Sequence, residues 1–164
     1  MTDPALFPYV QDEGEICSLQ PFDVCVAGGN LAVRDALGQV LAGLKALSLD
    51  IEETAIVELV LAEALNNIVE HAYPASLPQG PINIRCRHRA NGLHFTINDQ
   101  GNSMPDGQMP LGLPQNIEVD PIDLPEGGYG WFLIKDLAKD IQYHRVGQKN
   151  QLDLRIAVAI PRFK

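Results

Sequence analysis

Two alternating segments joined by a turn signal constrain the fold of this chain more than any other feature. Apolar residues occupy every second position of both segments: Ile82, Ile84, Cys86, Leu93, Phe95 and Ile97. Such alternation predicts strands with one apolar face. Asn91-Gly92 between the segments is a strong signal for a two-residue hairpin turn. We therefore expect an antiparallel hairpin from Ile82 to Arg89 and on to Asp99, with one face on a core.

Two segments before this hairpin have apolar residues at helical spacing. Asn30 is a candidate N-cap for a helix that runs to about Leu47. Ser48 or Asp50 can cap a second helix that runs to about Tyr73, where a proline follows. One apolar stripe of this second helix is formed by Val57, Val60, Leu61, Ala64, Leu65, Ile68 and Ala72. Both helices are therefore expected to cover a sheet.

Four further elements complete the expected fold. They are a strand at 16–26 interrupted by Pro21, a helix at 129–139, a strand at 141–145 and a strand at 152–160. Runs of helix and antiparallel strand indicate the α+β class, as a two-layer sandwich with helices packed on one face of a mixed, mostly antiparallel sheet. The length of 164 residues fits one domain, expected at 15–164 after a flexible arm at 1–14.

Residues 101–126 have no periodicity and are expected to form a lid. The segment holds five prolines and five acidic residues but no Lys or Arg. A loop of this length inside a compact domain is usually functional or disordered. Because glycines lie at both of its ends, we expect this segment to be a lid that covers a binding pocket.

The overall charge excludes several classes of function. Twelve Lys and Arg against 21 Asp and Glu give a net charge of −9. A nonspecific nucleic-acid binder needs a basic face, and so does a polybasic membrane anchor. No apolar run reaches the roughly 20 residues that span a bilayer. Three widely spaced cysteines without a CxxC motif are typical of reduced, buried thiols. We expect a soluble cytoplasmic protein.

Three polar or glycine-rich motifs follow one another in the order helix, strand end and glycine cluster. They read EALNNIVEHAY at 63–73, NDQG at 98–101 and EGGYGWFLI at 126–134. Glu63, Asn67 and Glu70 share one helix face at spacings of four and three. Each motif alone also has an ordinary structural explanation: a solvated helix face, an aspartate turn or a flexible hinge before a helix.

Taken together, the three motifs resemble the ATP-binding domain of the GHKL superfamily. In particular they resemble the anti-sigma-factor serine/threonine kinases, whose helix reads E-x-x-x-N-x-x-x-H-x-Y. The resemblance covers about residues 30–160 and implies a Bergerat-type, histidine-kinase-like ATP-binding fold. ATP and Mg²⁺ are the implied cofactors. Ser103 departs from the family pattern, which often has a second glycine at this position.

The resemblance also assigns roles to individual residues. Asn67 matches the family's magnesium ligand through its side-chain oxygen, and Mg²⁺ prefers oxygen ligands and retains several waters. Glu63 would orient or deprotonate the attacking hydroxyl, and Asp99 would accept a hydrogen bond from the adenine amino group above Gly101. The phosphates would meet the glycine cluster and helix start, which comprise Gly127, Gly128, Tyr129 and Gly130.

Two functions remain open at this stage. The leading one, which the resemblance implies, is an anti-sigma regulatory factor that phosphorylates an anti-anti-sigma (STAS-type) partner and holds a sigma factor. Similar anti-sigma factors form homodimers, so a homodimer is an oligomeric state to test. The alternative is a non-catalytic module that sequesters a regulatory partner, because the acidic lid offers no cation for the γ-phosphate. A histidine kinase is disfavoured, since no His is followed by an acidic residue. Topoisomerase and mismatch-repair functions would need further domains.

Overall fold

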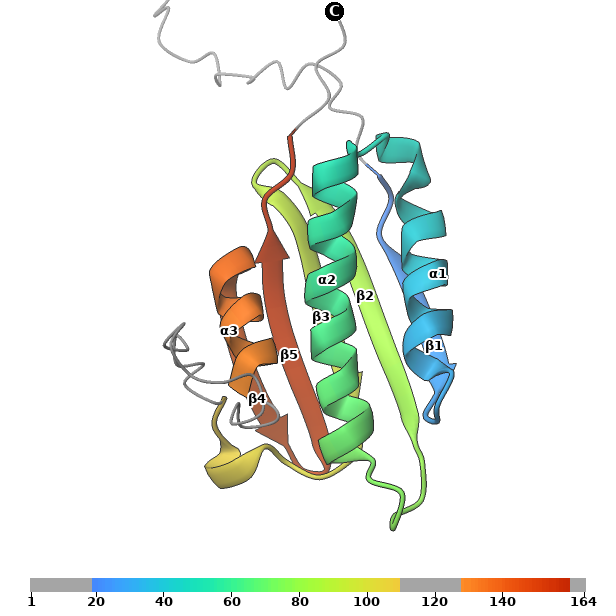
Figure 1. Cartoon of the computed structure of the whole chain (residues 1–164), viewed down its shortest axis with the longest axis vertical. Coiled ribbons are helices and arrows are strands. Elements are labelled where there is room, and N and C mark those ends of the chain that lie inside the picture. Colours follow the sequence, from blue (N-terminus) through green and yellow to red (C-terminus); the bar gives the residue numbers. More distant parts are fainter. Residues whose placement is uncertain (1–18, 110–127, 160–164) are drawn as a thin grey trace, which may run out of the picture.

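Five strands form one antiparallel sheet in this computed structural model, which describes residues 19–109 and 128–159 (Figure 1). The strand order is β1-β2-β3-β5-β4, and all four pairings are antiparallel. The strands are β1 (Phe22–Ala27), β2 (Pro81–Arg89), β3 (Gly92–Asp99), β4 (Lys139–Val146) and β5 (Lys149–Ile156). The central strand of the sheet is therefore β3, and its last residue, Asp99, lies between the paired strands β2 and β5.

Helices cover one face of this sheet (Figure 1). The α-helices are α1 (Ala32–Leu44), α2 (Ile51–Asn67) and α3 (Gly128–Leu137). Short 3-10 helices lie at Lys45–Leu47 and Pro105–Gly107, and a π-helical turn at Ile68–Ala72 extends α2. The expectation of an α+β two-layer sandwich with helices on one face is thereby confirmed.

The core lies between the two layers and follows the periodicity of the sequence. Phe95, Ile97 and Leu154 are at most 2% exposed on the sheet side, as are Leu61 and Leu65 on α2. The complete apolar stripe expected for the second helix is buried. Burying such side chains contributes about 1.5–3 kcal/mol each, so this stripe fixes which face of α2 packs on the sheet. Its polar face is then free to contribute to a site.

The turn between β2 and β3 differs by one residue from the prediction. Ala90 and Asn91 form the turn, and Gly92 already pairs with Arg89. Gly92 has φ +127°, and a Cβ atom there would lie 2.3 Å from the carbonyl oxygen of Ile156. The glycine is thus required by the close approach of β5 and by its backbone conformation.

The N-cap of the first helix was also predicted wrongly, whereas that of the second was right. Leu31 occupies the cap position of α1 without a side-chain hydrogen bond, because the turn from Gly29 to Ala32 already places Asn30 outside the helix. Asp50 caps α2, since its Oδ1 accepts from the backbone N–H of Glu53 at 2.7 Å.

Element boundaries shift elsewhere by a few residues. The first strand begins only after Pro21, and β5 ends at Ile156 instead of residue 160. Residues 110–126 of the expected lid and the expected arm at 1–14 lie outside the described residues, so both remain predictions.

The cysteines fit the expectation only in part, and Cys17 lies outside the described residues. Cys86 is buried, and desolvation raises the pKa of its thiol to about 12. Cys25 is a free thiol but is exposed on β1, which corrects the expectation of burial, since β1 is an edge strand whose alternate residues face outward. Among the helices described here, none has the length and apolar character needed to cross a membrane.

Candidate functional site

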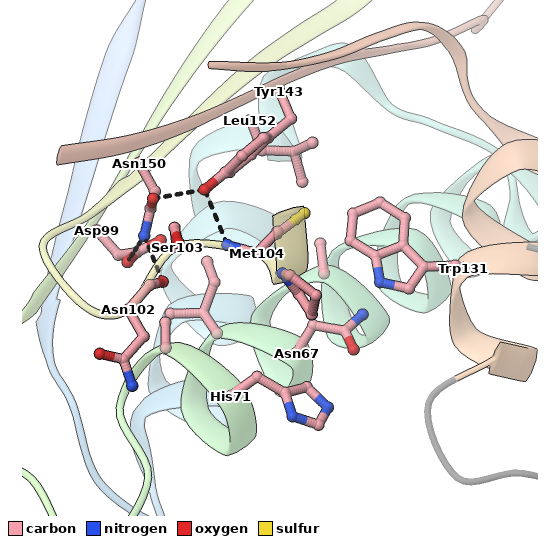
Figure 2. Close-up of a pocket in the computed structure, with 14 residues that line it drawn as sticks. Asn67, His71, Asp99, Asn102, Ser103, Met104, Trp131, Tyr143, Asn150 and Leu152 are labelled. Carbon is pink, nitrogen blue, oxygen red and sulfur yellow. Dashed lines mark hydrogen bonds between the residues drawn. The ribbon is translucent and has the colours of Figure 1, made fainter. Parts of the chain in front are cut away.

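A cavity of about 500 Å³ opens between α2, the ends of β3 and β5, and α3 (Figure 2). The residues that line it include Asn67, His71, Asp99, Met104, Trp131 and Asn150. All three sequence motifs thus reach the cavity, the third of them through Trp131. Trp131 belongs to the core, as expected, and also forms a wall of the cavity.

Asp99 lies at one end of this cavity with one oxygen occupied and one oxygen open. Its side chain is only 5% exposed. Oδ1 accepts hydrogen bonds from the backbone N–H of Gly101 at 2.9 Å and from Asn150 Nδ2 at 2.8 Å. Within the described residues no hydrogen bond reaches Oδ2. This end of the cavity therefore offers a buried acceptor to a ligand that can donate a hydrogen bond.

Burial raises the pKa of the Asp99 carboxyl above its ordinary value of 3.8. Desolvation is the largest cause, and the hydrogen bonds from Asn150 and Gly101 and the charge of Arg145 oppose it. A carboxylate in such a place gains from a donor on a ligand, because an open buried acceptor is costly.

Gly101 brings the end of β3 against the end of the helix. A Cβ atom at this position would lie 2.3 Å from the carbonyl oxygen of Ala72. The backbone N–H of Asn102 donates to that same oxygen at 2.9 Å. The close approach, and not the turn alone, explains why glycine stands here. Ser103, the departure from the family pattern, is exposed and lines the cavity.

The helix motif ends in a π-helical turn and reaches the cavity through Asn67 and His71. The backbone N–H of Tyr73 donates to the carbonyl of Ile68 at 2.9 Å, five residues earlier. His71 lies on the cavity wall, whereas neither Glu63 nor Glu70 is part of that wall, and Glu70 lies 3.9 Å from the His71 ring. Of the face expected for Glu63, Asn67 and Glu70, only Asn67 therefore lines the cavity.

The last residue of the helix motif is structural. The Tyr73 hydroxyl donates to the carbonyl of Pro81 at 2.9 Å and accepts from the N–H of Gln100 at 2.7 Å. Burial raises the pKa of Tyr73, so it remains a phenol at neutral pH. Tyr73 thus connects the end of the helix to the beginning of β2 and to the residue after Asp99.

Asn67 lines the cavity on the side of α3, and Glu63 and Gly130 lie directly behind it. Asn67 Nδ2 donates to the backbone carbonyl of Glu63 at 2.9 Å, which leaves Oδ1 without a partner among the described residues. A Cβ atom on Gly130 would lie 2.5 Å from Glu63 Oε2 and 3.9 Å from Asn67 Nδ2. The absence of a side chain at Gly130 therefore leaves room for the Glu63 carboxylate.

The glycine cluster is described in part. Gly127 lies outside the described residues, Gly128 is the first residue of α3, and Tyr129 and Gly130 follow it in the helix. The first backbone N–H groups of a helix have no partner within it and attract anions. Gly130 places this end of α3 beside Glu63 and Asn67.

The donor set at this end suits Mg²⁺. Asn67 Oδ1 and the Glu63 carboxylate are hard oxygen donors, and a magnesium ion in a nucleotide site takes one or two such donors beside phosphate and water. The described residues contain no cluster of three or more His, Cys, Asp or Glu side chains that could hold a metal by themselves. Any ion here would therefore depend on phosphate oxygens of a ligand.

Asn150, Tyr143 and Arg145 were not singled out by the sequence. Asn150 is 4% exposed and donates to Asp99, and the Tyr143 hydroxyl donates to Asn150 Oδ1 at 2.6 Å (Figure 2). Arg145 Nη1 donates to the same oxygen at 2.7 Å. All three lie around the β4–β5 turn, where a polar residue is ordinary. Only the pairing of β5 with β3, which sets Asn150 opposite Asp99, reveals their place.

Comparison with known proteins gives a family and several relatives. A family model described as "Histidine kinase-like ATPase domain" matches residues 30–156. The "Serine-protein kinase RsbW" of Bacillus licheniformis is 30% identical over 116 residues, which are 70% of this chain and 65% of that protein. The protein of the same name from Staphylococcus epidermidis is 31% identical over 114 residues, 69% of this chain and 70% of that protein.

A solved structure has the same fold. The crystal structure of the RsbU and RsbW domains of Rv1364c from Mycobacterium tuberculosis superposes with a TM-score of 0.59 at 15% identity. The match covers 86% of this chain and 33% of that one. The present chain thus spans about two thirds of the curated relatives and one third of the chain in that crystal structure.

Proposed function

This chain belongs to the histidine kinase-like ATPase domain family, and we propose on that premise that it is an ATP-dependent serine/threonine protein kinase. Its similarity to two proteins named serine-protein kinase, along about 70% of its length, supports this activity. The observation that carries the proposal is one cavity with an open buried acceptor on Asp99 at one end and Asn67 at the other, where Glu63 and Gly130 lie beside Asn67.

ATP would lie along the cavity with its adenine base at Asp99 and its phosphates toward α3. The adenine amino group donates to Asp99 Oδ2, which has no partner within the described residues. The phosphates lie toward Asn67 and the N–H groups at the start of α3. His71 is the one basic side chain among the described residues that line the cavity, and it follows Asn67 by one helical turn. Bound Mg²⁺ would supply charge neutralisation on the phosphates, with Asn67 as its protein ligand.

The transfer step requires a base beside the incoming hydroxyl. The oxygen of a partner's serine or threonine bonds to the γ-phosphorus as the bond to the oxygen between the β- and γ-phosphates breaks, which leaves ADP. The hydroxyl proton passes to the Glu63 carboxylate. Gly130 leaves the Glu63 carboxylate the space it needs for this role.

The regulatory role we propose is that of an anti-sigma factor in a partner-switching system. The substrate is a small anti-anti-sigma protein of the STAS type, and the competing partner is a sigma factor. Transcription is regulated by which of the two is held. Both partners and ATP occur in the cytoplasm, where the protein would act, and a homodimer is the oligomeric state we propose to test.

A first experiment tests nucleotide binding. Calorimetric titration of ATP and ADP, with and without Mg²⁺, is compared between the wild type and Asn67→Ala. We expect magnesium-dependent binding that Asn67→Ala weakens about tenfold or more. The absence of binding at millimolar nucleotide would overturn the kinase proposal.

The second candidate function is a non-catalytic binding module. It is favoured by one observation: no Lys or Arg is among the described residues that line the cavity. Incubation with ATP labelled at the γ-phosphate and a purified STAS-type protein separates the two. Label on the acceptor, lost in Glu63→Gln, supports the kinase. Nucleotide binding without transfer to any acceptor supports the module.

A further inference from the structure

Asn150 is the centre of the hydrogen bonds around Asp99. Its Nδ2 donates to Asp99 Oδ1 at 2.8 Å, to the Asn102 carbonyl at 2.8 Å and to the Gly101 carbonyl at 3.3 Å (Figure 2). One buried amide therefore connects the carboxylate to the chain segment that leaves β3. An amide that bridges three acceptors must present its NH₂ group to them, because its oxygen has nothing to donate.

Two side chains of β4 set the orientation of this amide. The Tyr143 hydroxyl and Arg145 Nη1 both donate to Asn150 Oδ1, at 2.6 and 2.7 Å. Arg145 also donates to the Gly101 carbonyl at 3.0 Å, and the Tyr143 hydroxyl accepts from the N–H of Met104 at 3.0 Å. A flipped amide would set its oxygen against Asp99 and two carbonyls and its NH₂ against two donors, so the observed orientation is strongly preferred.

Within the described residues the Asp99 carboxylate accepts hydrogen bonds from the Gly101 N–H and from Asn150 Nδ2, and both reach Oδ1. Donors stabilise the ionised form of a carboxyl group. The open Oδ2 is thereby held as an acceptor. Of the two common substituents at the six position of a purine, an amino group can donate to such an oxygen, whereas a keto oxygen would face it as a second acceptor.

We propose that Asn150 determines base specificity, by holding Asp99 as an acceptor and so selecting 6-amino over 6-oxo purine nucleotides. This inference rests on the proposed nucleotide site. Asn150 acts through Asp99 and is therefore a positioning residue. Its effect should appear in the ratio of two affinities, which a loss of fold alone would not change.

The test compares the affinity for ATP and for ITP, whose base has a keto oxygen at the six position. In Asn150→Asp, two carboxyl groups of the same shape lie about 2.8 Å apart, and such a pair shares one proton. The Asp99 carboxyl group is then protonated part of the time and is no longer held as an acceptor for the base. We expect ATP affinity to fall about ten- to a hundredfold and ITP affinity to fall less. The ratio of ATP affinity to ITP affinity should therefore decrease about tenfold.

Asn83→Asp is the matched control. It makes the same amide-to-carboxylate change on β2, at a half-exposed position whose neighbours Ile82 and Ile84 are the residues that face the core. Both affinities should stay within about twofold of the wild type, since a surface change away from a site has little effect. A change of the ratio in this control would overturn the specific role of Asn150.

A second pair of variants tests the orientation of the amide without changing Asn150. In Tyr143→Phe, Arg145 still donates to Asn150 Oδ1, and we expect the ATP/ITP ratio to be retained. In Tyr143→Phe with Arg145→Met, both donors are gone, the amide can flip, and the ratio should narrow as in Asn150→Asp. Near-ultraviolet circular dichroism of Trp131 reports whether each variant folds, and if Asn150→Asp does not, the double variant decides.

Equal losses of ATP and ITP affinity, with the ratio unchanged, would overturn the inference and leave the proposed function intact. If the wild type bound neither nucleotide, the proposed function itself would fail. The wild-type titration and the variant ratios therefore separate the two failures.

Discussion

The two ends of the cavity are built in different ways. At the base end, Asp99 and Asn150 are 5% and 4% exposed, come from neighbouring strands, and take part in a network of side-chain hydrogen bonds. At the phosphate end, Glu63, Asn67 and Gly130 come from two helices, and within the described residues the one side-chain hydrogen bond there runs from Asn67 to the backbone of Glu63.

This difference indicates which end of the cavity would determine the affinity for ATP and which the rate of phosphoryl transfer. A satisfied, buried network is rigid and can recognise one shape of ligand before the ligand arrives. Polar groups that have few partners in the protein are available for phosphates, an ion and a hydroxyl. Changes at the base end should therefore alter affinity, and changes at the phosphate end should alter the transfer rate.

The largest effect is expected at Glu63. Glu63→Gln keeps the size of the side chain but removes the base, so transfer of labelled γ-phosphate to a partner should fall about 10²–10⁴-fold. ATP affinity should stay within about threefold, because Glu63 is not part of the cavity wall. Glu58→Gln, on the exposed face of the same helix, is the control. Parallel losses of rate and affinity would break the proposed division between the two ends.

Asp99→Asn should have the next largest effect, and on affinity. The amide oxygen can still accept from Gly101 and Asn150, but the ionised acceptor for the base is lost, and ATP affinity should fall about ten- to a hundredfold by calorimetry.

The raised pKa of Asp99 means that the folded chain holds the carboxyl proton more tightly than the unfolded chain. The contribution of this proton to stability is therefore present below pH 3.8 and lost as pH rises through the raised pKa.

The same variant therefore makes a prediction about stability. At neutral pH Asp99→Asn should unfold at the same temperature as the wild type or a higher one, since a buried charge has been removed. Unfolding at a lower temperature would indicate that the carboxylate holds the fold together as well as the ligand.

Gly130→Ala should produce an intermediate effect on rate. The new Cβ would lie 2.5 Å from Glu63 Oε2 and must displace that carboxylate. We expect transfer to slow about tenfold with ATP affinity within about threefold. Gly38→Ala, in α1 with no atom within 4 Å of the new Cβ, should leave both unchanged and raise stability by about 0.5–1 kcal/mol. Equal transfer rates in the Gly130→Ala variant and the wild type would remove Gly130 from the site.

The smallest expected effect is a pH dependence of ATP affinity. Because the pKa of Asp99 is raised, the carboxylate accepts a proton at a higher pH than an ordinary aspartate does. Lowering the pH from 8 toward the raised pKa should then weaken ATP binding more in the wild type than in Asp99→Asn, which controls for protonation of the phosphates. Identical pH profiles of the two proteins down to pH 4 would contradict a contact between the Asp99 carboxylate and the base.

Most of the fold could be predicted because its signals are local. The alternation through Phe95 and Ile97, the stripe on the second helix and the Asp50 cap each depend on neighbours within a few residues, and the structure bears them out. The misplaced turn before Gly92 and the missing cap at Asn30 have a different cause. At Gly92 the distant carbonyl of Ile156 approaches the backbone, and at Asn30 the turn from Gly29 to Ala32 moves the start of the helix.

The sequence by itself determined the α+β class and the identity of the motif residues Glu63, Asn67, Asp99 and Gly101, since these follow from periodicity, spacing and resemblance. Only the tertiary structure decided that Asn150 stands beside Asp99 and that Gly130 faces Glu63. The physical reason is that strand pairing and helix packing join residues 50 or more positions apart, and no local pattern records which of them will meet.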